Sequence, residues 1–307
     1  MSKVVAVHGV GQQFRGSAVL EDIWLPSMRD GLLQAGYPRI DDVSLTCAFY
    51  GDLFRDPSKP PRGKKGPPGG APGGGNGLRQ VESRRPLYQS HHATGQTDDL
   101  ERELLKAWYQ HSAELDQGKA KPASSGRSHS RSFLVKIYAQ FFGSPLWTTI
   151  LARSLIGDAS QISTYMLDPA IRVAARVRLV DAIGPDTRVI VGHSLGAVVA
   201  YETLCLYPGL PVRAFVTLGS PLGIKNLIFD RLEPEPENDV GRWPSDIRFW
   251  HNIVDPSDII ALGEPLRPLF GPKVTDHFVD NGNRPHDLGR YLSSPETGYS
   301  IISGLQE

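Results

Sequence analysis

The sequence has few cysteines, no excess of charge of either sign and no long uninterrupted apolar run. Its two cysteines, Cys47 and Cys205, are far apart and lie in apolar segments, so no disulfide framework is expected. Lys plus Arg and Asp plus Glu each number 33, so no net basic charge is present to attract nucleic acid. These features favour a reducing, cytoplasmic setting and argue against nucleic acid as a partner.

Residues 4–7, and the uncharged part of residues 133–156, the most apolar stretch of the chain, are both too short to be a targeting or membrane-spanning element. Residues 4–7 are too few for the apolar region of a signal peptide and are expected to form the first strand. Within residues 133–156, only sixteen uncharged residues separate Lys136 from Arg153, too few to cross a membrane. Two interpretations stay open for residues 133–156: a buried helical hairpin, which we prefer, and a lid or acyl-chain surface over an active site.

Short apolar segments rich in β-branched residues recur along the chain and alternate with helical patterns or long connections. Six strands are expected, at residues 3–7, 43–50, 188–191, 213–218, 247–254 and 274–279. Helices are expected at about residues 18–35, 98–116, 169–183 and 195–206. Because strands with few polar residues are buried on both faces, we predict an α/β fold with a mainly parallel, doubly wound sheet.

The regular alternation is interrupted between residues 51 and 165. Residues 56–76 are rich in Pro, Gly and Lys, a composition that buries too little surface to offset the entropy of ordering, and we expect a disordered loop there. Residues 98–156 contain the candidate helical cap or lid. The chain is therefore predicted to have one catalytic core, residues 1–50 and 166–307, with an insertion at residues 51–165.

The clearest catalytic motif is the sequence Gly-His-Ser-Leu-Gly at residues 192–196, between an apolar strand and a helical segment. A nucleophilic serine at such a junction occupies a strained turn, and the flanking glycines let strand and helix pass closely. The helix that follows directs its amide hydrogens and positive dipole end at a developing oxyanion. Ser194 is therefore the predicted nucleophile.

In this context the motif resembles the elbow of the α/β-hydrolase superfamily, specifically of its lipases and esterases. The resemblance extends over nearly the whole chain outside residues 51–165. It implies an α/β-hydrolase sheet of six strands, catalysis without a metal or organic cofactor, and a triad in the order serine, acid, histidine.

The sequence His8-Gly9-Val10-Gly11, directly after the first strand, looks like the His-Gly oxyanion loop of this superfamily. The superfamily places that loop after its third strand, so its first two strands would be missing here. The resemblance implies oxyanion donors at the amides of Gly9, Val10 and Leu195. For the His8 ring we expect a structural hydrogen bond.

Two carboxylates, Asp255 and Asp258, follow the fifth expected strand, and either could orient an imidazole. Residues 252–266 look like the Asn-Ile…Pro-x-Asp-Pro-Val-Ala segment of DDHD-type phospholipases, which places Asp258 at the acid position. The proline that follows the acid in that family is Ile259 here. Because Asp255 precedes a proline and suits a turn or cap, Asp258 is the predicted acid and Asp255 the alternative.

Two histidines compete for the role of general base. His277 falls within the last expected strand, whereas His286 lies in the loop that follows it. A loop at the carboxyl end of a strand can bring an imidazole to the serine, so His286 is predicted. Its spacing to Tyr291 and Ser294 also loosely resembles the His-x-x-Tyr-Trp-x-Ser ending of the DDHD phospholipases, with one residue added and the tryptophan absent.

The aromatic side chains Phe141, Phe142 and Trp147 suggest an apolar acyl group. A small-molecule or lipid-like ester is therefore the expected substrate, and peripheral contact with a membrane is compatible with it. The same triad also serves thioesterases and amidases. A rival from another class is a binding or scaffold protein that keeps the fold without the chemistry, and the ordered serine, acid and histidine argue against it.

A metal site is not expected. The adjacent pair His91 and His92 has Asp98 and Asp99 nearby, but it lies in a polar segment without the fixed geometry that metal ligands need.

Overall fold

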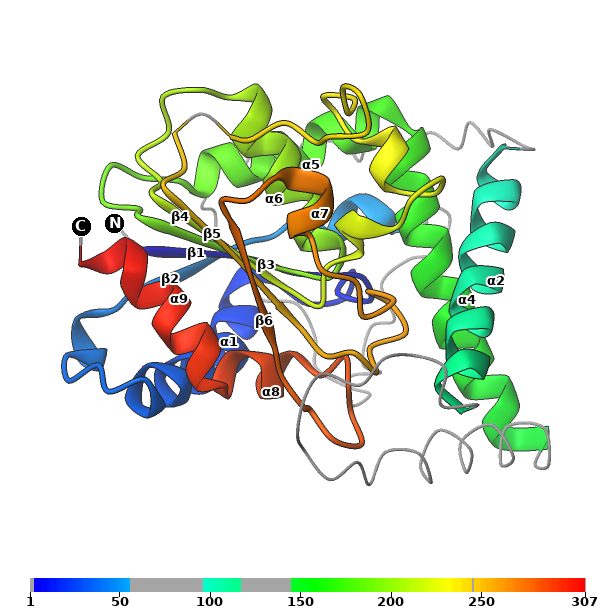
Figure 1. Cartoon of the computed structure of the whole chain (residues 1–307), viewed down its shortest axis with the longest axis horizontal. Helices are drawn as coiled ribbons and strands as arrows, with labels where there is room; N and C mark the ends of the chain where they lie inside the picture. The colour runs from blue at the N-terminus through cyan, green and yellow to red at the C-terminus, as the bar shows by residue number, and fades with distance from the viewer. Residues whose placement is uncertain (1–2, 56–95, 117–144, 245, 307) are drawn as a thin grey trace, which may run out of the picture.

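Six parallel strands form the centre of the fold (Figure 1). The computed structural model describes residues 3–55, 96–116, 145–244 and 246–306. The strands are Val4–Val7 (β1), Leu45–Ala48 (β2), Val189–His193 (β3), Ala214–Leu218 (β4), Phe249–Val254 (β5) and Val274–Phe278 (β6). They lie in the order β2-β1-β3-β4-β5-β6, and every neighbouring pair is parallel. The predicted α/β-hydrolase sheet is confirmed.

Helices connect these strands along the described parts of the chain. They are Ser17–Gln34 (α1), Gln96–Asp116 (α2), Pro145–Leu167 (α4), Pro169–Ala182 (α5), Leu195–Leu206 (α6), Arg267–Phe270 (α7), Leu288–Ser293 (α8) and Pro295–Leu305 (α9). Short 3-10 turns occur at Ile40–Asp42, Gly51–Phe54, Pro221–Gly223 and Phe229–Arg231. The four helices expected from the sequence are found with ends that differ by no more than two residues.

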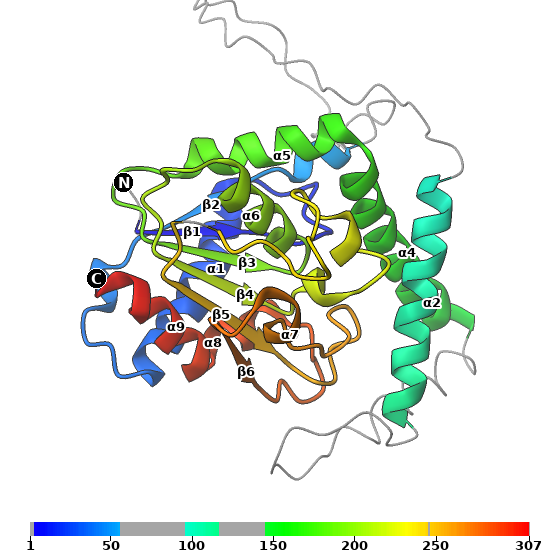
Figure 2. The ribbon, with the colours of Figure 1, turned by 45° about the horizontal axis from the view of Figure 1, so that its top comes forward.

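Helices cover both faces of the sheet, α1, α8 and α9 on one and α5 and α6 on the other (Figures 1 and 2). Strand β1 shows how the sequence achieves this. Val4 and Ala6 join the core beside α1, whereas Val5 and Val7 join the core beside α5 and α6, and all four are fully buried. A strand covered on both faces needs no polar alternation, which is why β1 reads as a continuous apolar run.

The order of the strands reverses beside β1. The chain passes from β1 to β2 on one side and later enters β3 on the other. At such a switch point the loops that follow the two strands diverge and leave a crevice at their carboxyl ends. The loop after β1 begins at His8 and the turn after β3 contains Ser194, so the topology brings these two segments together at the carboxyl ends of the strands.

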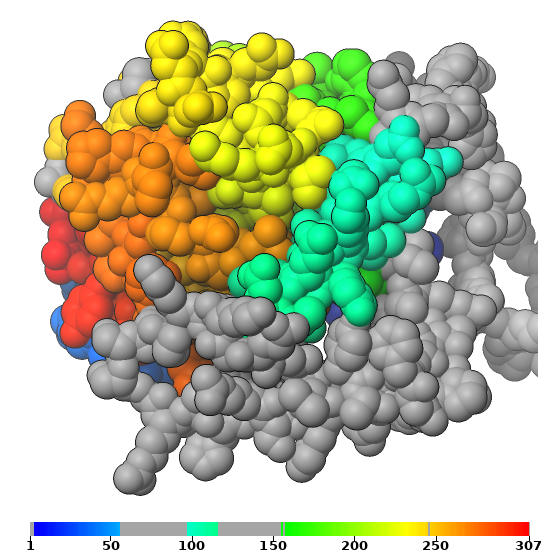
Figure 3. All heavy atoms as spheres, turned by 45° about the vertical axis from the view of Figure 1, so that its right-hand side comes forward, coloured from blue at the N-terminus to red at the C-terminus, as the bar shows by residue number. Residues whose placement is uncertain are grey.

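Helices α2 and α4 pack against each other at the end of the molecule toward which the strands run (Figures 1 and 2). In the space-filling view α2 lies across this end (Figure 3). Helix α4 contains residues 145–156 of the apolar segment, and residues 133–144 lie outside the described residues, as does the segment 56–76. Farther along α4, Ile162 and Tyr165 are fully buried in the main core.

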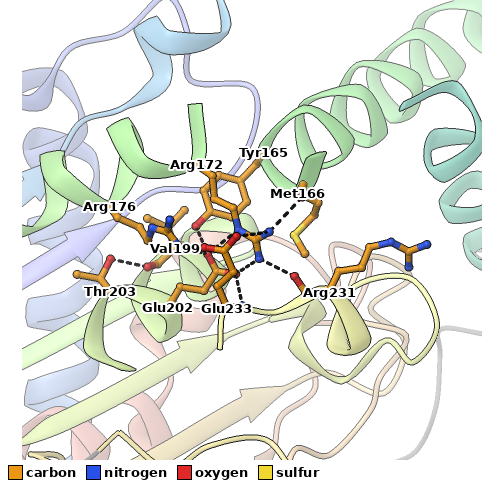
Figure 4. Close-up of polar contacts among 9 residues, drawn as sticks. All are labelled: Tyr165, Met166, Arg172, Arg176, Val199, Glu202, Thr203, Arg231 and Glu233. Atoms are coloured by element: carbon orange, nitrogen blue, oxygen red, sulfur yellow. Dashed lines mark hydrogen bonds and ion pairs between the residues drawn. The ribbon is translucent and has the colours of Figure 1, made fainter. Parts of the chain in front are cut away.

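A buried ionic network fixes the end of α4 to the core (Figure 4). Glu202 of α6 is fully buried and accepts hydrogen bonds from the Tyr165 hydroxyl (2.7 Å) and from Nε of Arg172 (3.0 Å). Nη1 of Arg176 and the backbone N–H of Glu233 also donate hydrogen bonds to the Glu202 carboxylate, at 3.3 Å and 3.1 Å. Both arginines also pair with the Glu233 carboxylate. The two negative and two positive charges balance, which lets the network stay out of water.

Both cysteines are free thiols, with Cys47 buried and Cys205 partly buried. None of the helices in the described ranges is both long and apolar enough to span a bilayer.

Candidate active site

Ser194 occupies a sharp turn between β3 and α6, with φ 54° and ψ −128°. The flanking glycines allow the chain to pass closely there. A Cβ at position 192 would lie 2.7 Å from the Cα of Ala197, and one at position 196 would lie 2.1 Å from the carbonyl oxygen of Val7. Real Cβ atoms do not approach other atoms this closely, so Gly192 and Gly196 hold α6 against β1 and β3.

Asp258, in the loop after β5, meets His286, in the loop after β6. Nδ1 of His286 donates to Oδ2 of Asp258 at 2.7 Å. The same oxygen accepts the Tyr291 hydroxyl at 2.8 Å, and Oδ1 accepts the backbone N–H groups of Ile260 (3.0 Å) and Ala261 (3.3 Å). Asp258 is fully buried, so these four donors replace the water that its carboxylate loses on folding.

The pKa of His286 reflects two opposing effects. Burial, the largest single effect, would lower it, but the carboxylates of Asp258, Asp158 and Asp287 together raise it, and the pKa lies above its ordinary value of 6.5. Asp258 thus favours the protonated imidazolium over the neutral ring. The His286 side chain is 27% exposed, so solvent reaches the ring although Asp258 is enclosed.

Asp255, the alternative acid, has different partners. Its Oδ1 accepts the backbone N–H of Ser257 at 2.7 Å, and its Oδ2 accepts that of Asn281 at 2.6 Å. These bonds join the end of β5 to the loop after β6. Burial raises the pKa of Asp255 to about 6. Of the two carboxylates proposed from the sequence, the structure brings Asp258 to the imidazole and uses Asp255 to connect two loops.

The loop after β1 lies directly against the serine. A Cβ at Gly9 would be 2.8 Å from the Cβ of Ser194. The His8 ring donates from Nδ1 to the Gly9 carbonyl (2.7 Å), accepts the Tyr50 backbone N–H at Nε2 (3.2 Å) and stacks on the Tyr50 ring. Because a trans peptide places its N–H opposite its carbonyl, this arrangement turns the Val10 N–H away from His8. Burial lowers the pKa of His8 to about 4, so the ring stays neutral.

The Ser194 side chain is fully buried, and its Oγ has no hydrogen-bond partner among the described residues. The neighbouring ring of His193 lies 4.7 Å from the ring of His286, measured between centroids. His286 therefore lies beside the elbow, but its bond to the serine hydroxyl is not formed in this conformation. Hydrogen bonds between a nucleophile and its base often tighten only when substrate binds.

Side chains of α2 and α4 also face this region. Gln161 of α4 accepts the Gly11 backbone N–H at 3.2 Å, and Asp158 lies next to the same glycine. Burial raises the pKa of Asp158 to about 6, an effect that His286 partly offsets. His111 of α2 has its pKa lowered by burial, while the Pro256 backbone acts in the opposite direction. The two helices therefore lie over the loop after β1, which contains Gly11, and the loop after β5, which contains Pro256 and Asp258.

Sequence reasoning missed Gly219, which follows β4. Its φ is +51°, and a Cβ there would lie 2.6 Å from Oδ2 of Asp258 and 3.1 Å from Nδ1 of His286. The sequence signal that could have identified it is a glycine directly after the buried strand β4. The sequence singles out Tyr291 only through its loose resemblance to the DDHD phospholipases. Its hydrogen bond to Asp258 joins residues 33 positions apart and forms only in the folded chain.

Other sequence predictions fall on residues that the structure does not describe. Phe141 and Phe142 lie outside the described residues, and Trp147 lies in the first turn of α4, so their acyl-binding role stays a prediction. His91 and His92 also lie outside. Within the described ranges, no group of three or more His, Cys, Asp or Glu residues is arranged to hold a metal ion. His277 lies in β6 and forms a 3.0 Å hydrogen bond with His251.

The sheet and the site geometry define an α/β-hydrolase fold. A family model described as the alpha/beta hydrolase family matches residues 153–297, which contain β3 to β6 together with Ser194, Asp258 and His286. Comparison with curated proteins and with solved structures gave no match. The family match supports placing the chain in the α/β-hydrolase superfamily and supports hydrolase activity in general.

Proposed function

We propose that the protein is a serine hydrolase that cleaves carboxylic esters through an acyl-enzyme. Ser194 is the nucleophile, His286 the general base and Asp258 the acid that orients it. The hydrogen bond between His286 and Asp258, formed beside a serine held in a left-handed turn, carries this proposal.

The first half-reaction forms the acyl-enzyme. As Oγ of Ser194 attacks the ester carbonyl carbon, Nε2 of His286 takes its proton, and the imidazolium faces the Asp258 carboxylate. The carbonyl oxygen becomes an oxyanion, which the amides of Gly9, Val10 and Leu195 stabilise. The carbon–oxygen bond to the alcohol then breaks, and His286 returns the proton to the leaving alcohol.

The second half-reaction releases the acid. A water molecule gives a proton to His286 and attacks the acyl carbon, and the same amides hold the second oxyanion. Collapse of this intermediate returns the proton to Oγ of Ser194 and frees the carboxylic acid. Leu195 suits the donor role because it is the first residue of α6, where backbone amides have no acceptor within the helix. Removal of one such donor typically costs about 10²- to 10³-fold in kcat.

For the substrate we propose an ester with an apolar acyl group. The aromatic residues at 141, 142 and 147 and the likeness of residues 252–266 to DDHD-type phospholipases support it. Hydrolysis rates over a series of acyl chain lengths, in soluble and dispersed form, test this part. Equal rates on dispersed lipid and on short soluble esters would leave an esterase without lipid preference. Faster turnover of matched thioesters or amides than of esters would favour a thioesterase or an amidase instead.

Labelling with a fluorophosphonate probe tests the nucleophile itself. The wild-type protein should be labelled at Ser194, and Ser194→Ala should not be labelled, while circular dichroism shows both proteins to be folded. His286→Ala should be labelled much more slowly, because the hydroxyl loses its base. Folded wild-type protein that resists labelling would contradict the proposal and favour a binding or scaffold role.

A further inference from the structure

His193 is the last residue of β3 and directly precedes the proposed nucleophile, yet the proposed reaction gives it no role. Because side chains alternate along a strand, its ring lies on the same face of the sheet as the side chain of Val191, which belongs to the core beside α1. Tyr291 of α8 belongs to the same core. The strand therefore directs His193 to the side of the sheet where α8 lies.

Four side chains form a closed group at this end of β3. The His193 ring lies 4.7 Å from the His286 ring, measured between centroids, with an interplanar angle of 34°. His286 is bonded to Asp258, and Asp258 to the Tyr291 hydroxyl. The Tyr291 ring in turn lies 6.2 Å from the His193 ring. The imidazole of His286 is thus held by a hydrogen bond to Asp258 and by ring packing on His193.

His193 also adjoins the loop after β1. A Cβ at Gly9 would lie 3.3 Å from Nδ1 of His193 and 2.8 Å from the Cβ of Ser194, so only glycine lets that loop approach both residues. One side chain, His193, therefore contacts the loop that carries the proposed oxyanion donors and the ring of the proposed base. Its position relates these two parts of the site to each other.

The His193 ring is neutral. Burial lowers its pKa well below the ordinary value of 6.5, although the His286 backbone acts in the opposite direction. A neutral ring does not oppose the positive charge that His286 acquires when it takes the serine proton, whereas a second imidazolium would. Nε2 of His193 is buried and has no hydrogen-bond partner among the described residues, so this nitrogen adds no bond to the packing of the ring.

A second contact is needed to hold the base in one orientation. The bond to Asp258 fixes Nδ1 of His286, but a ring held at one atom can still pivot about that atom. Packing against the neighbouring ring of His193 removes this freedom. Reacting groups must be aligned closely, and a displacement of about 1 Å can cost about 100-fold in rate.

We propose that His193 is a positioning residue, whose ring packs against His286 and holds the imidazole at the angle from which it reaches the serine hydroxyl. This inference rests on the proposed serine hydrolase activity and adds a residue to it. His193 forms no bond in the reaction and takes no proton. It acts through His286.

Three variants separate ring packing from a polar role. His193→Phe keeps an aromatic ring and removes both nitrogens, His193→Asn keeps polar atoms and removes the ring, and His193→Ala removes both. His277→Ala is the matched control, because it removes a histidine whose ring also packs against another histidine, with centroids 5.2 Å apart. Kinetics on a chromogenic ester and rates of fluorophosphonate labelling are measured on the full chain, and circular dichroism shows that each variant is folded.

We expect kcat of His193→Ala and His193→Asn to fall by about 10- to 100-fold with KM within about twofold, because the base is misaligned while substrate binding is kept. His193→Phe should stay within about fivefold of the wild-type kcat, since the ring contact is restored. Labelling rates should follow the same order. His277→Ala should match the wild-type protein in both measurements.

Proton NMR observes the imidazole without any substrate. The proton in the short hydrogen bond between Nδ1 of His286 and Asp258 gives a signal far downfield, and its loss in Asp258→Asn identifies it. The signal should be sharp in the wild-type protein and in His193→Phe. It should be broadened by exchange with water in His193→Ala and His193→Asn, where the ring is free to pivot.

Unchanged kcat in folded His193→Ala would overturn the inference, and so would recovery of kcat by His193→Asn but not by His193→Phe. A loss expressed mainly as a higher KM would also overturn it, because His193 would then belong to the substrate-binding surface. Folded wild-type protein that is not labelled at Ser194 would contradict the serine hydrolase proposal itself. The NMR signal would in that case still show whether His193 holds the imidazole.

Discussion

His286 and Asp258 share a 2.7 Å hydrogen bond between Nδ1 and Oδ2, and that oxygen also accepts the hydroxyl of Tyr291. The Tyr291 hydroxyl in turn accepts the backbone N–H of Asp255 at 2.9 Å. Tyr291 of α8, itself bound to the backbone after β5, therefore orients the Asp258 carboxylate independently of the imidazole. His286 meets an acceptor whose position is already fixed, which holds the ring in one tautomer.

Replacement of the two neighbouring carboxylates should have unequal effects on turnover. In Asp258→Asn the imidazolium loses its counter-charge and the ring its fixed tautomer, so kcat should fall by about 10³- to 10⁴-fold. Asp255→Asn should keep kcat within about tenfold, because that carboxylate contacts backbone amides and not the imidazole. Steady-state kinetics on a chromogenic ester checks both variants. A larger loss in Asp255→Asn than in Asp258→Asn would reverse the assignment of the acid.

The pH dependence of kcat/KM should report the raised pKa of His286. The base acts when neutral, so activity should rise with pH, with a midpoint above 6.5. Asp158 is one of the charges that raise this pKa, so Asp158→Asn should move the midpoint to lower pH. Asp99→Asn, at a 71% exposed side chain of α2, should leave it in place. A midpoint in Asp158→Asn that stays where it is in the wild-type protein would show that the two side chains are not coupled.

The His8 ring is expected to support catalysis without touching substrate. In His8→Ala the Gly9 carbonyl loses its donor, and the Val10 N–H loses its fixed direction. We expect kcat to fall by about 10- to 100-fold with a small change in KM, since the loss falls on the oxyanion. Tyr50→Phe keeps the ring stacked on His8 and removes only the hydroxyl that donates to the His8 carbonyl, so it should cost less. Unchanged kcat in folded His8→Ala would show that the loop holds its shape alone.

The network around Glu202 should matter for stability. Glu202→Ala leaves Arg172 and Arg176 short of negative charge in a buried site, and the free energy of unfolding should fall by about 3–5 kcal/mol. Glu237→Ala, at a side chain that is 81% exposed, should change it by less than about 0.5 kcal/mol. Urea unfolding followed by circular dichroism measures both. Equal stability of the two variants would show that the network adds nothing beyond packing.

Elements whose pattern is local could be predicted from the sequence. Strand β1 appears as a continuous apolar run because both of its faces are buried. The bounds of α6 follow from the elbow before it and the apolar run within it. The candidate residues Ser194, Asp258 and His286 were chosen from their order relative to strands, and the structure brings Asp258 and His286 into contact because parallel strands end at one edge.

Contacts between distant segments could not be predicted in the same way. Glu202 was visible as a charged residue inside the apolar run of α6, but its partners come from α4, α5 and the segment after Arg231. The approach of Asp158 to Gly11 depends on how α4 lies over the end of the sheet. No spacing in the sequence encodes either arrangement, because each depends on the packing of whole helices.

Ser194 is held at a positive φ that glycine adopts without strain, whereas other residues there cost about 1–3 kcal/mol. Conformational stability and chemistry therefore make opposite demands on this position. Selection for a long-lived fold alone would place glycine at 194, since relief of strain would make the inactive chain harder to unfold. On the proposed function, the serine at this position is a compromise in which the fold gives up some of its own stability to hold a reactive hydroxyl.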